Sequence, residues 1–267
     1  MFTPADHTFV LCGYKESPFI EEALKSLERQ TVRTNILVST STPNDYLRDI
    51  CARHGVWMVV NTGKTGLGED WNFGYNQANT KLVTIAHQDD IYEPEFAEKV
   101  LKAANGCRKK ELQIVYTGYY ELRNGKRVEN NRLLKIKRAM NAPMKMGAFA
   151  GSKLGKRLLL SFGDPICCPS VTFNKGVVGP SVFDTGYKNS SDYSTWVRLA
   201  LVPGRFAYVP EALMGHRIYA GSTTTKNLAE SIRKKEDLEV LSSLWPMPIA
   251  GLINKIYSKS EKSNKTK

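Results

Sequence analysis

The alternation of apolar runs with amphipathic stretches in the first hundred residues is the feature that most limits the fold. Four short apolar runs have the length of strands: 8–12, 36–39, 56–60 and 82–86. Three stretches between them place apolar residues at helical spacing: 18–30, 43–50 and 69–78. Strands that alternate with helices in this way predict an α/β fold, in which helices cover both faces of a mostly parallel sheet.

Two residues are predicted to mark helix starts in this part of the chain. Ser17 is placed to cap the first helix, and Pro43 to occupy the first turn of the second. After Gly106 the regular alternation stops. The later elements predicted from the pattern are an apolar run at 112–120, strands at 171–173 and 206–209, and helices at 193–201 and 226–244.

The positive charge of the chain is concentrated in two segments. The formal net charge is +12, yet residues 123–157 hold eleven Lys or Arg against one acid, and residues 252–267 hold five Lys against one acid. Hydrophobic residues at 42% and charged residues at 24% are ordinary for a folded domain. Such basic segments are typical of a nucleic-acid-binding surface, and equally of a protein that works beside an anionic membrane.

The cysteines and the N-terminus bear on the cellular compartment. Five cysteines, an odd number without a Cys-x-x-Cys pair, argue against a disulfide framework and against a structural zinc site. Residues 1–7 have neither a basic start nor an apolar stretch, and no run reaches the ~18 apolar residues of a membrane span. We therefore expect a cytoplasmic protein.

Two adjacent carboxylates follow directly after the strand predicted at 82–86. The chain there reads His87-Gln88-Asp89-Asp90, and ligands of parallel sheets bind beyond the carboxyl ends of strands. Carboxylate oxygens are the ligands that Mg²⁺ and Mn²⁺ prefer, and the same ion can bridge to a substrate diphosphate. The alternative is that Asp90 caps the helix beginning near Pro94 and that Asp89 is merely solvated.

Several motifs occur in the order found in one enzyme family. They are the opening strand and helix with Glu16, Asn72-Phe73-Gly74, the acidic segment 87–90, the segment 191–199 that reads SDYSTWVRL, and the segment 216–224 that begins His216-Arg217. Over roughly residues 8–225 the chain resembles the family-two glycosyltransferases of the GT-A fold, of the kind that build bacterial surface polysaccharides. The resemblance implies the α/β fold named above.

The resemblance also implies a donor site for a nucleoside-diphosphate sugar with a divalent cation, Mn²⁺ or Mg²⁺. Asp89 would bind the cation, His216 would complete its shell, Gln88 would lie near the donor ribose, and Asp90 would support the loop. The residues implied to contact the donor are Cys12, Tyr14, Glu16, Thr40, Asn72, Gln88, Asp89 and Arg217. Two alternatives to His216 as a ligand are the position of Tyr219, where many relatives carry a histidine, and a purely surface role for His216.

The second strand of the family commonly ends in acids that contact the nucleotide base. Here residues 38–42 read Val-Ser-Thr-Ser-Thr, so recognition of the base must differ. The polar stretch 222–225, between Arg217 and Lys226, could close over the diphosphate, although a solvated loop is the simpler interpretation.

On the acceptor side, the resemblance makes Asp192 the general base of an inverting transfer. A carboxylate there would take the proton from an acceptor hydroxyl as that oxygen attacks the sugar. The alternative for Asp192 is the N-cap of the helix that carries Trp196. Trp196 itself is interpreted as an acceptor contact, with burial in the core as its alternative.

These inferences lead to a domain scheme and to three functional hypotheses. The scheme is a catalytic domain over 1–225, with a nucleotide-sugar half at 1–105 and an acceptor half at 106–225, a C-terminal helical region at 226–257 and a disordered basic tail at 258–267. The leading hypothesis is a metal-dependent, inverting hexosyl- or deoxyhexosyltransferase that acts on a lipid-linked glycan acceptor at the inner membrane face.

Part of the C-terminal region is expected to take part in membrane contact. Residues 241–257 mix apolar side chains with lysines, so they could rest in a membrane interface or pack onto the catalytic domain. One competing hypothesis is a non-catalytic nucleic-acid-binding protein. The other is a degenerate sugar-nucleotide-binding protein, prompted by His87, Thr40 and Ser191, which stand where the family usually carries acids.

Overall fold

A computed structural model describes residues 1–108, 111–219 and 227–261 of the chain. The stretch 222–225 and Lys226, predicted to close over a diphosphate, lie outside these ranges. Within them, no helix combines the length and the apolar character that crossing a bilayer requires.

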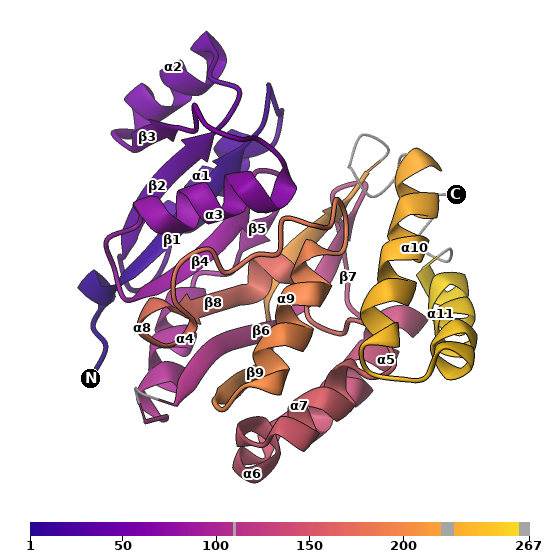
Figure 1. Ribbon diagram of the computed structural model, residues 1–267. Coiled ribbons are helices and arrows are strands. Elements are labelled where there is room, and N and C mark those ends of the chain that lie inside the picture. The colour runs from indigo at the N-terminus through magenta and orange to yellow at the C-terminus, as the bar shows by residue number, and fades with distance from the viewer. Residues whose placement is uncertain (109–110, 220–226, 262–267) are drawn as a thin grey trace.

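The first half of the chain forms a parallel sheet, as its apolar pattern predicts (Figure 1). Strand order is β3-β2-β1-β4, from β1 (His7–Gly13), β2 (Asn35–Thr40), β3 (Trp57–Val60) and β4 (Leu82–His87). The connecting helices are α1 (Ile20–Glu28), α2 (Asp45–His54) and α3 (Leu67–Gln77). All seven predicted elements are confirmed.

The starts of two helices differ from the prediction. Ser17 does not cap α1, because that helix begins two residues later than predicted, at Ile20, with Phe19 in the cap position. The cap of α2 is Asn44, whose side chain accepts a hydrogen bond from the backbone nitrogen of Leu47, so Pro43 precedes the helix instead of lying in its first turn. Asn caps a helix start well because its carbonyl oxygen satisfies an otherwise unpaired N–H group.

The second half extends the same sheet with mixed pairing. Strand β8 (Val171–Asn174) pairs antiparallel with β4 and with β6 (Leu112–Arg123). Strand β9 (Arg205–Ile218) runs parallel to β6 and then pairs with the short β5 (Ile91–Tyr92), while β7 (Lys126–Val128) forms a hairpin with β6.

Strand β9 is much longer than the predicted 206–209, because an irregularity near Pro210 lets pairing with β6 resume beyond it. The backbone there comes so close to Gly118 that a Cβ on Gly118 would lie 2.6 Å from the carbonyl oxygen of Pro210. The absence of a side chain at Gly118 thus permits the bulge, which carries the end of β9 toward the loop after β4.

The remaining helices surround this sheet. They are α4 (Phe96–Asn105), α5 (Arg132–Asn141), α6 (Gly147–Gly151), α7 (Lys153–Leu160), α8 (Lys175–Val178), α9 (Ser191–Leu201), α10 (Asn227–Ser242) and α11 (Met247–Glu261), with 3₁₀ turns at Pro4–Asp6, Ala142–Lys145 and Cys168–Ser170. Helix α11 continues to Glu261, inside the predicted disordered tail 258–267, so the predicted tail starts too early.

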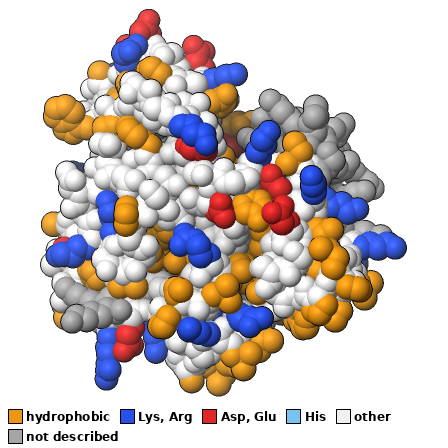
Figure 2. Space-filling view, viewed as in Figure 1, with side chains coloured by type: hydrophobic (Ala, Val, Ile, Leu, Met, Phe, Trp, Pro, Cys, Tyr) orange, Lys and Arg blue, Asp and Glu red, His pale blue; other side chains and the backbone are white. Residues whose placement is uncertain are grey.

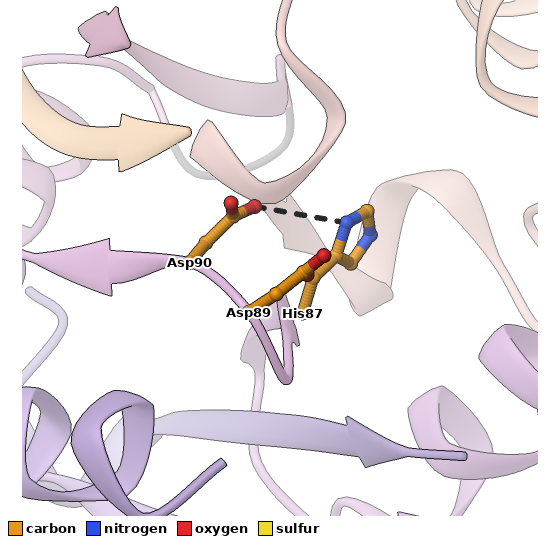
Figure 3. A group of neighbouring side chains, drawn as sticks. All are labelled: His87, Asp89 and Asp90. Atoms are coloured by element: carbon orange, nitrogen blue, oxygen red, sulfur yellow. Dashed lines mark ion pairs between the residues drawn. The ribbon is translucent and has the colours of Figure 1, made fainter. Parts of the chain in front are cut away.

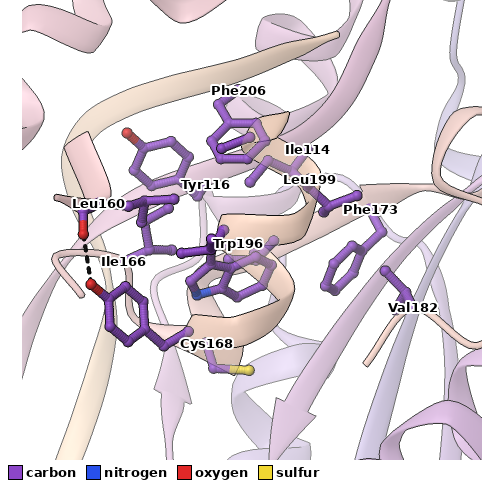
Figure 4. Packing of buried hydrophobic residues seen from close by; sticks show 14 of the residues in the cluster. Ile114, Tyr116, Leu160, Ile166, Cys168, Phe173, Val182, Trp196, Leu199 and Phe206 are labelled. Carbon is purple, nitrogen blue, oxygen red and sulfur yellow. Dashed lines mark hydrogen bonds between the residues drawn. The ribbon is translucent and has the colours of Figure 1, made fainter. Parts of the chain in front are cut away.

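The core consists of two apolar clusters, one on each face of the sheet. Phe9 and Leu11 of β1 pack with α1, α2 and α4, whereas Val10 between them packs with α3 and α9. Trp196 lies at the centre of the second cluster, fully buried and stacked on Phe173 at 5.6 Å (Figure 4). The interpretation of Trp196 as an acceptor contact is therefore wrong. The residue belongs to the core.

A lysine is buried in the same region. The Nζ atom of Lys156 on α7 donates hydrogen bonds to Gln113 Oε1 (2.7 Å) and to the backbone oxygens of Leu199 (3.1 Å) and Val202 (2.8 Å). Because these acceptors have no solvent to replace the lysine, we expect Lys156→Ala to lower the free energy of unfolding by about 3 kcal/mol. Urea unfolding measures the change, and Arg157→Ala, an exposed neighbour on α7, should differ from the native chain by less than about 0.5 kcal/mol.

The same lysine gives stability a pH dependence. Burial lowers the pKa of Lys156 to about 8 from its ordinary 10.5, so the folded chain releases this proton more readily than the unfolded chain. The additional stability that comes from this proton release is therefore lost as the pH falls through about 8 and fully present above 10.5, whereas the hydrogen bonds contribute on both sides of that range. The difference in unfolding free energy between the native chain and Lys156→Ala should widen from pH 8 to pH 9.5. A constant difference would contradict this explanation.

Candidate functional site

The carboxyl ends of β1, β2 and β4 meet at one edge of the sheet. Cys12 on β1 lies opposite Ser39 on β2 and opposite His87 on β4, and Gly13 lies opposite Thr40. The loops that follow these strands therefore share one edge, which is where ligands bind in sheets of this kind.

The loop after β4 gathers three potential metal ligands. Ligand atoms of His87, Asp89 and Asp90 all lie within 4.8 Å of one another (Figure 3). The ring of His87 stacks on Trp71 of α3, with 5.0 Å between ring centroids. Its Nε2 atom is buried and makes no hydrogen bond with any part of the chain that the structure describes. The other ring nitrogen, Nδ1, faces the carboxylates, 3.8 Å from Asp90 Oδ2 (Figure 3), so it is the nitrogen that this cluster offers to a cation.

Asp90 is fixed by the end of β9. Because Ile91 pairs with Gly215, Asp90 lies beside His216, whose Nδ1 is 3.1 Å from Asp90 Oδ1. The same oxygen accepts a hydrogen bond from the backbone nitrogen of Arg217 at 2.9 Å. Burial alone would raise the pKa of Asp90, but the charge and the hydrogen bond of His216 lower it below its usual value. Asp90 is thus an ionised, internally bonded support of the loop.

Asp89 differs from its neighbour in its surroundings. Burial, and then the charge of Asp90, raise the pKa of Asp89 to about 6, while a hydrogen bond from Tyr219 opposes that rise. A carboxylate beside another carboxylate is stabilised by a bound cation, which removes their mutual repulsion. The oxygen of Asp89 and a ring nitrogen of His87 fit Mg²⁺ or Mn²⁺. The structure groups Asp89 with His87 and Asp90, whereas the Nδ1 atom of the predicted ligand His216 is bonded to Asp90.

Two residues predicted to touch the donor serve the loops around it. Arg217 donates from Nε to the backbone oxygen of Asp89 (2.8 Å) and from Nη2 to Glu22 on α1 (2.6 Å). Gln88 is bonded to both backbone groups of Tyr14, accepting from its nitrogen (2.8 Å) and donating to its oxygen (3.2 Å). These contacts join the loops after β1 and β4 to each other and to the end of β9. The two side chains therefore hold the loops around the acidic cluster in position.

An acid on α3 lies next to the end of β2, and sequence reasoning missed its role there. Asp70, in the first turn of α3, accepts hydrogen bonds from Ser41 Oγ (2.7 Å) and from Asn61 Nδ2 (2.7 Å). Its carboxylate therefore lies near the end of β2, where this chain lacks the acids that the family commonly carries. Nearby, a shallow hollow of about 490 Å³ is lined by the loops after β1 and β2, including the predicted residue Glu16. In the sequence, the signal for Asp70 is only that of an acid at a helix start.

Asn72 is placed in a structural role. Its amide donates to the backbone oxygen of Phe183 and accepts from the backbone nitrogen of the same residue, both at 2.8 Å. This pair of bonds holds the segment that leads to α9. A second hollow, of about 600 Å³, opens beside it and includes Lys64, Asp184 and Arg198 in its lining.

Asp192 lies in the first turn of α9 and is half-buried. The helix begins at Ser191, so Asp192 is inside the helix and the N-cap alternative is wrong. A second carboxyl, that of the buried Asp164, interacts with it electrostatically. Burial, and then the charge of Asp192, raise the pKa of Asp164 well above its usual range. Asp164 is therefore the member of the pair that keeps its proton more readily, and Asp192 is the member that ionises more readily.

Two cations flank this acid pair. Burial raises the pKa of Asp192, and the charges of Arg233 on α10 and Lys137 on α5 oppose that rise. A carboxylate with a raised pKa that stays ionised beside cations is suited to accept a proton from a hydroxyl group. Sequence reasoning missed Asp164, although it is the only acid between Glu129 and Asp184.

Helix α10 belongs to this site. Glu236 accepts hydrogen bonds from three consecutive backbone nitrogens, those of residues 188, 189 and 190, at 2.9, 2.8 and 3.0 Å. The neighbouring Asp237 accepts from Ser190 Oγ at 2.7 Å. These bonds fix the segment that directly precedes Asp192, so α10 helps to position that carboxylate.

The thiol of Cys167 is influenced by the charge of Asp90 and by the charges of the Asp164 and Asp192 pair. Burial, and then the charge of Asp90, raise its pKa well above the usual value, and Asp164 and Asp192 raise it further. Cys167 therefore lies within electrostatic range of the loop after β4 and of the acid pair.

Comparison with known proteins places this arrangement in a family context. The family model described as Glycosyl transferase family 2 matches residues 8–157. Among curated proteins, the uncharacterized glycosyltransferase EpsJ of Bacillus subtilis (strain 168) is 27% identical over 135 residues, which is 49% of this chain and 38% of that protein. The chain thus spans well under two thirds of the length of this relative.

Solved structures show the same fold. The mannosyltransferase PcManGT from Pyrobaculum calidifontis, in complex with GDP-Man and Mn²⁺, has a TM-score of 0.60 at 14% identity, over 94% of this chain and 75% of that one. S. aureus TarS 1-349, in complex with UDP-GlcNAc, has a TM-score of 0.60 at 14% identity, over 93% and 70%. The predicted fold, a mostly parallel GT-A sheet flanked by helices, is confirmed.

Proposed function

The chain belongs to glycosyl transferase family 2, and from that premise we propose that it is an inverting, metal-dependent glycosyltransferase. It would move a hexosyl or deoxyhexosyl group from a nucleoside-diphosphate sugar to a hydroxyl of a lipid-linked glycan, at the inner face of the cell membrane, in cell-surface polysaccharide synthesis. The observation that supports this most is the grouping of Asp89 with His87 and Asp90 after β4, with Cys167 within electrostatic range of Asp90 and of the pair formed by Asp164 and Asp192.

On the donor side, Asp89 and His87 would hold Mn²⁺ or Mg²⁺. When bound, the cation would neutralise charge that develops on the departing diphosphate. Asp90, His216 and Arg217 keep the loop in position through their mutual hydrogen bonds. The two similar structures were solved with GDP-Man and with UDP-GlcNAc, so guanosine and uridine nucleotides are the first candidates for the donor.

On the acceptor side, Asp192 would accept the proton of the attacking hydroxyl. The acceptor oxygen forms a bond to the anomeric carbon as the bond to the diphosphate oxygen breaks, and this single displacement inverts the configuration at that carbon. The raised pKa of Asp164 favours its neutral form, which would place no second negative charge beside Asp192. Glu236 holds the preceding segment, so the carboxylate is oriented before the acceptor arrives.

The proposal is tested by thermal unfolding with a panel of nucleoside diphosphates and their sugars, with Mn²⁺, Mg²⁺ or a chelator. A ligand that binds the folded chain at a hundred times its Kd adds about 2.7 kcal/mol of stability. We expect one nucleotide to raise the unfolding temperature in the presence of metal, and the chelator to abolish the rise.

Two results would overturn the proposed function in different ways. The absence of any nucleotide-dependent shift, together with salt-sensitive binding to nucleic acid, would favour a nucleic-acid-binding protein. A nucleotide-dependent shift without turnover, on any acceptor in a membrane lipid extract, would favour a degenerate protein that binds a nucleotide sugar.

A further inference from the structure

Helices α7 and α11 expose large apolar side chains to solvent. Leu154 on α7 is 68% exposed, and Phe162, just beyond that helix, is 54% exposed. Leu252 and Ile256 on α11 are 61% and 64% exposed. With the exposed Leu158 between Leu154 and Phe162, these residues recur every four positions in each segment, so each segment has one apolar stripe. We call the two stripes together the apolar ridge.

The two stripes are joined where the segment after α7 contacts the turn before α11. Trp245, in the turn before α11, donates from its indole nitrogen to the backbone oxygen of Ser161 at 2.8 Å. Its ring lies 6.0 Å from that of Phe162. The exposed Met247 and Ile249 follow directly on α11. Figure 2 shows hydrophobic side chains gathered along the same lower and right-hand borders of the molecule, interspersed with basic ones.

The two segments that form the ridge carry charge of one sign. Residues 130–163 and 242–260 contain no Asp or Glu. Exposed basic side chains lie on the ridge helices or next to them: Lys145, Lys153, Arg157 and Lys255. An apolar stripe bordered by cations, with an aromatic pair at its centre, matches the surface of an anionic bilayer, in which acyl chains lie beneath phosphate groups.

We propose that the apolar ridge docks this protein on an anionic lipid bilayer, with the stripe in the interface and the basic side chains against lipid phosphates. The occupant is a membrane and not a second copy of the chain, because self-association through this face would bring the like charges of Lys153 and Arg157 together. The inference rests on the proposed function and deepens it, since it supplies the surface by which the enzyme would reach a lipid-linked acceptor.

The ridge is continuous with the acceptor side of the site. Helix α7 ends at Leu160, whose backbone oxygen accepts a hydrogen bond from Tyr193 on α9 at 2.6 Å. Four residues further on lies Asp164, and its backbone oxygen accepts a hydrogen bond from Tyr257 of α11 at 3.4 Å. Both ridge helices therefore bond to the surroundings of Asp192, so a docked bilayer would lie next to the acid pair.

Cosedimentation with vesicles tests the proposal. The native chain should bind vesicles of phosphatidylcholine mixed with phosphatidylglycerol, and should bind vesicles of phosphatidylcholine alone only weakly. Replacing the two cations together, Lys153→Gln with Arg157→Gln, should weaken binding to the anionic vesicles by roughly 25-fold, since each basic residue near such a surface contributes about fivefold. The double variant Leu252→Asp with Ile256→Asp should weaken it at least as much.

Matched controls come from the opposite end of the molecule. Trp57 on β3 is 82% exposed, and Arg48 on α2 is likewise exposed, so Trp57→Asp and Arg48→Gln make the same kinds of change away from the ridge. Both controls should bind anionic vesicles like the native chain. Unfolding temperatures, with and without the nucleotide found by the panel, show that each variant is folded and retains its donor site.

Three outcomes would overturn the docking surface. They are no binding of the native chain to anionic vesicles, equal losses in the ridge variants and the controls, and a native dimer in analytical ultracentrifugation that the ridge variants dissociate. A chain that binds nucleotide but no vesicle refutes the ridge and leaves the transferase in place. A chain that binds vesicles but no nucleotide refutes the proposed transferase and leaves the docking surface in place.

Discussion

Replacing Asp192 by Asn is expected to lower the rate of sugar transfer about a thousandfold, the largest effect we expect of any single substitution in this chain. The amide has nearly the shape of the carboxyl group but accepts no proton from a hydroxyl, so the acceptor oxygen would attack without general-base assistance. Release of the nucleoside diphosphate, measured with a membrane lipid extract as the acceptor source, reports the rate. The nucleotide-dependent rise in unfolding temperature should remain, because Asp192 lies on the acceptor side.

Asp164→Asn is the matched comparison for this prediction. Asp164 keeps its proton more readily than Asp192, because burial and the charge of Asp192 raise its pKa well above the usual range. Exchange for a neutral amide of similar shape should therefore cost less than about tenfold in rate. If Asp164→Asn abolished transfer while Asp192→Asn left most of it, the two acids would have the opposite roles. If neither change mattered, the acid pair would not be the catalytic centre.

The elements of the first half follow from the sequence because the signals are local. Periods of two and of 3.6 residues appear within single strands and helices, and parallel pairing places every carboxyl end at one edge. The apolar pattern by itself therefore assigns the acids at 89 and 90 to that edge. It does not reveal their different environments, because His216 and Arg217 reach Asp90 only through the pairing of β5 with β9.

The acceptor side depends on contacts between residues far apart in the chain. Glu236 and Asp237 are ordinary charged residues of a polar helix in the sequence, and only the packing of α10 brings them to residues 188–190. For Trp196 the sequence predicts a functional contact that the structure does not support. The family motif includes it, yet its side chain is buried in the core. A motif identifies a segment, whereas the direction of each side chain is set by tertiary packing.

Replacing Asp89 by Ala should remove the metal-dependent part of donor binding and lower transfer by roughly a hundredfold to a thousandfold. In the proposed site this side chain would supply an oxygen ligand that His87 could not replace alone, and the charge of the leaving diphosphate would then not be neutralised. The thermal panel measures the binding effect. The rise of about 2.7 kcal/mol expected at a hundred times Kd should fall to the value found with chelator present. Asp49→Ala, an exposed acid on α2, should leave that rise unchanged.

Asp90→Asn separates the supporting role from the ligand role. The carboxylate of Asp90 is buried and bonded to His216 and to the backbone nitrogen of Arg217, so the amide should lower the free energy of unfolding by about 2 kcal/mol. Asp89→Ala should change that free energy little in the absence of ligand, because the removal of one of two neighbouring acids relieves their repulsion. If instead Asp89→Ala retained the metal-dependent rise and Asp90→Asn lost it at unchanged stability, Asp90 would be the main ligand, and the bonds to β9 would have to open when the cation binds.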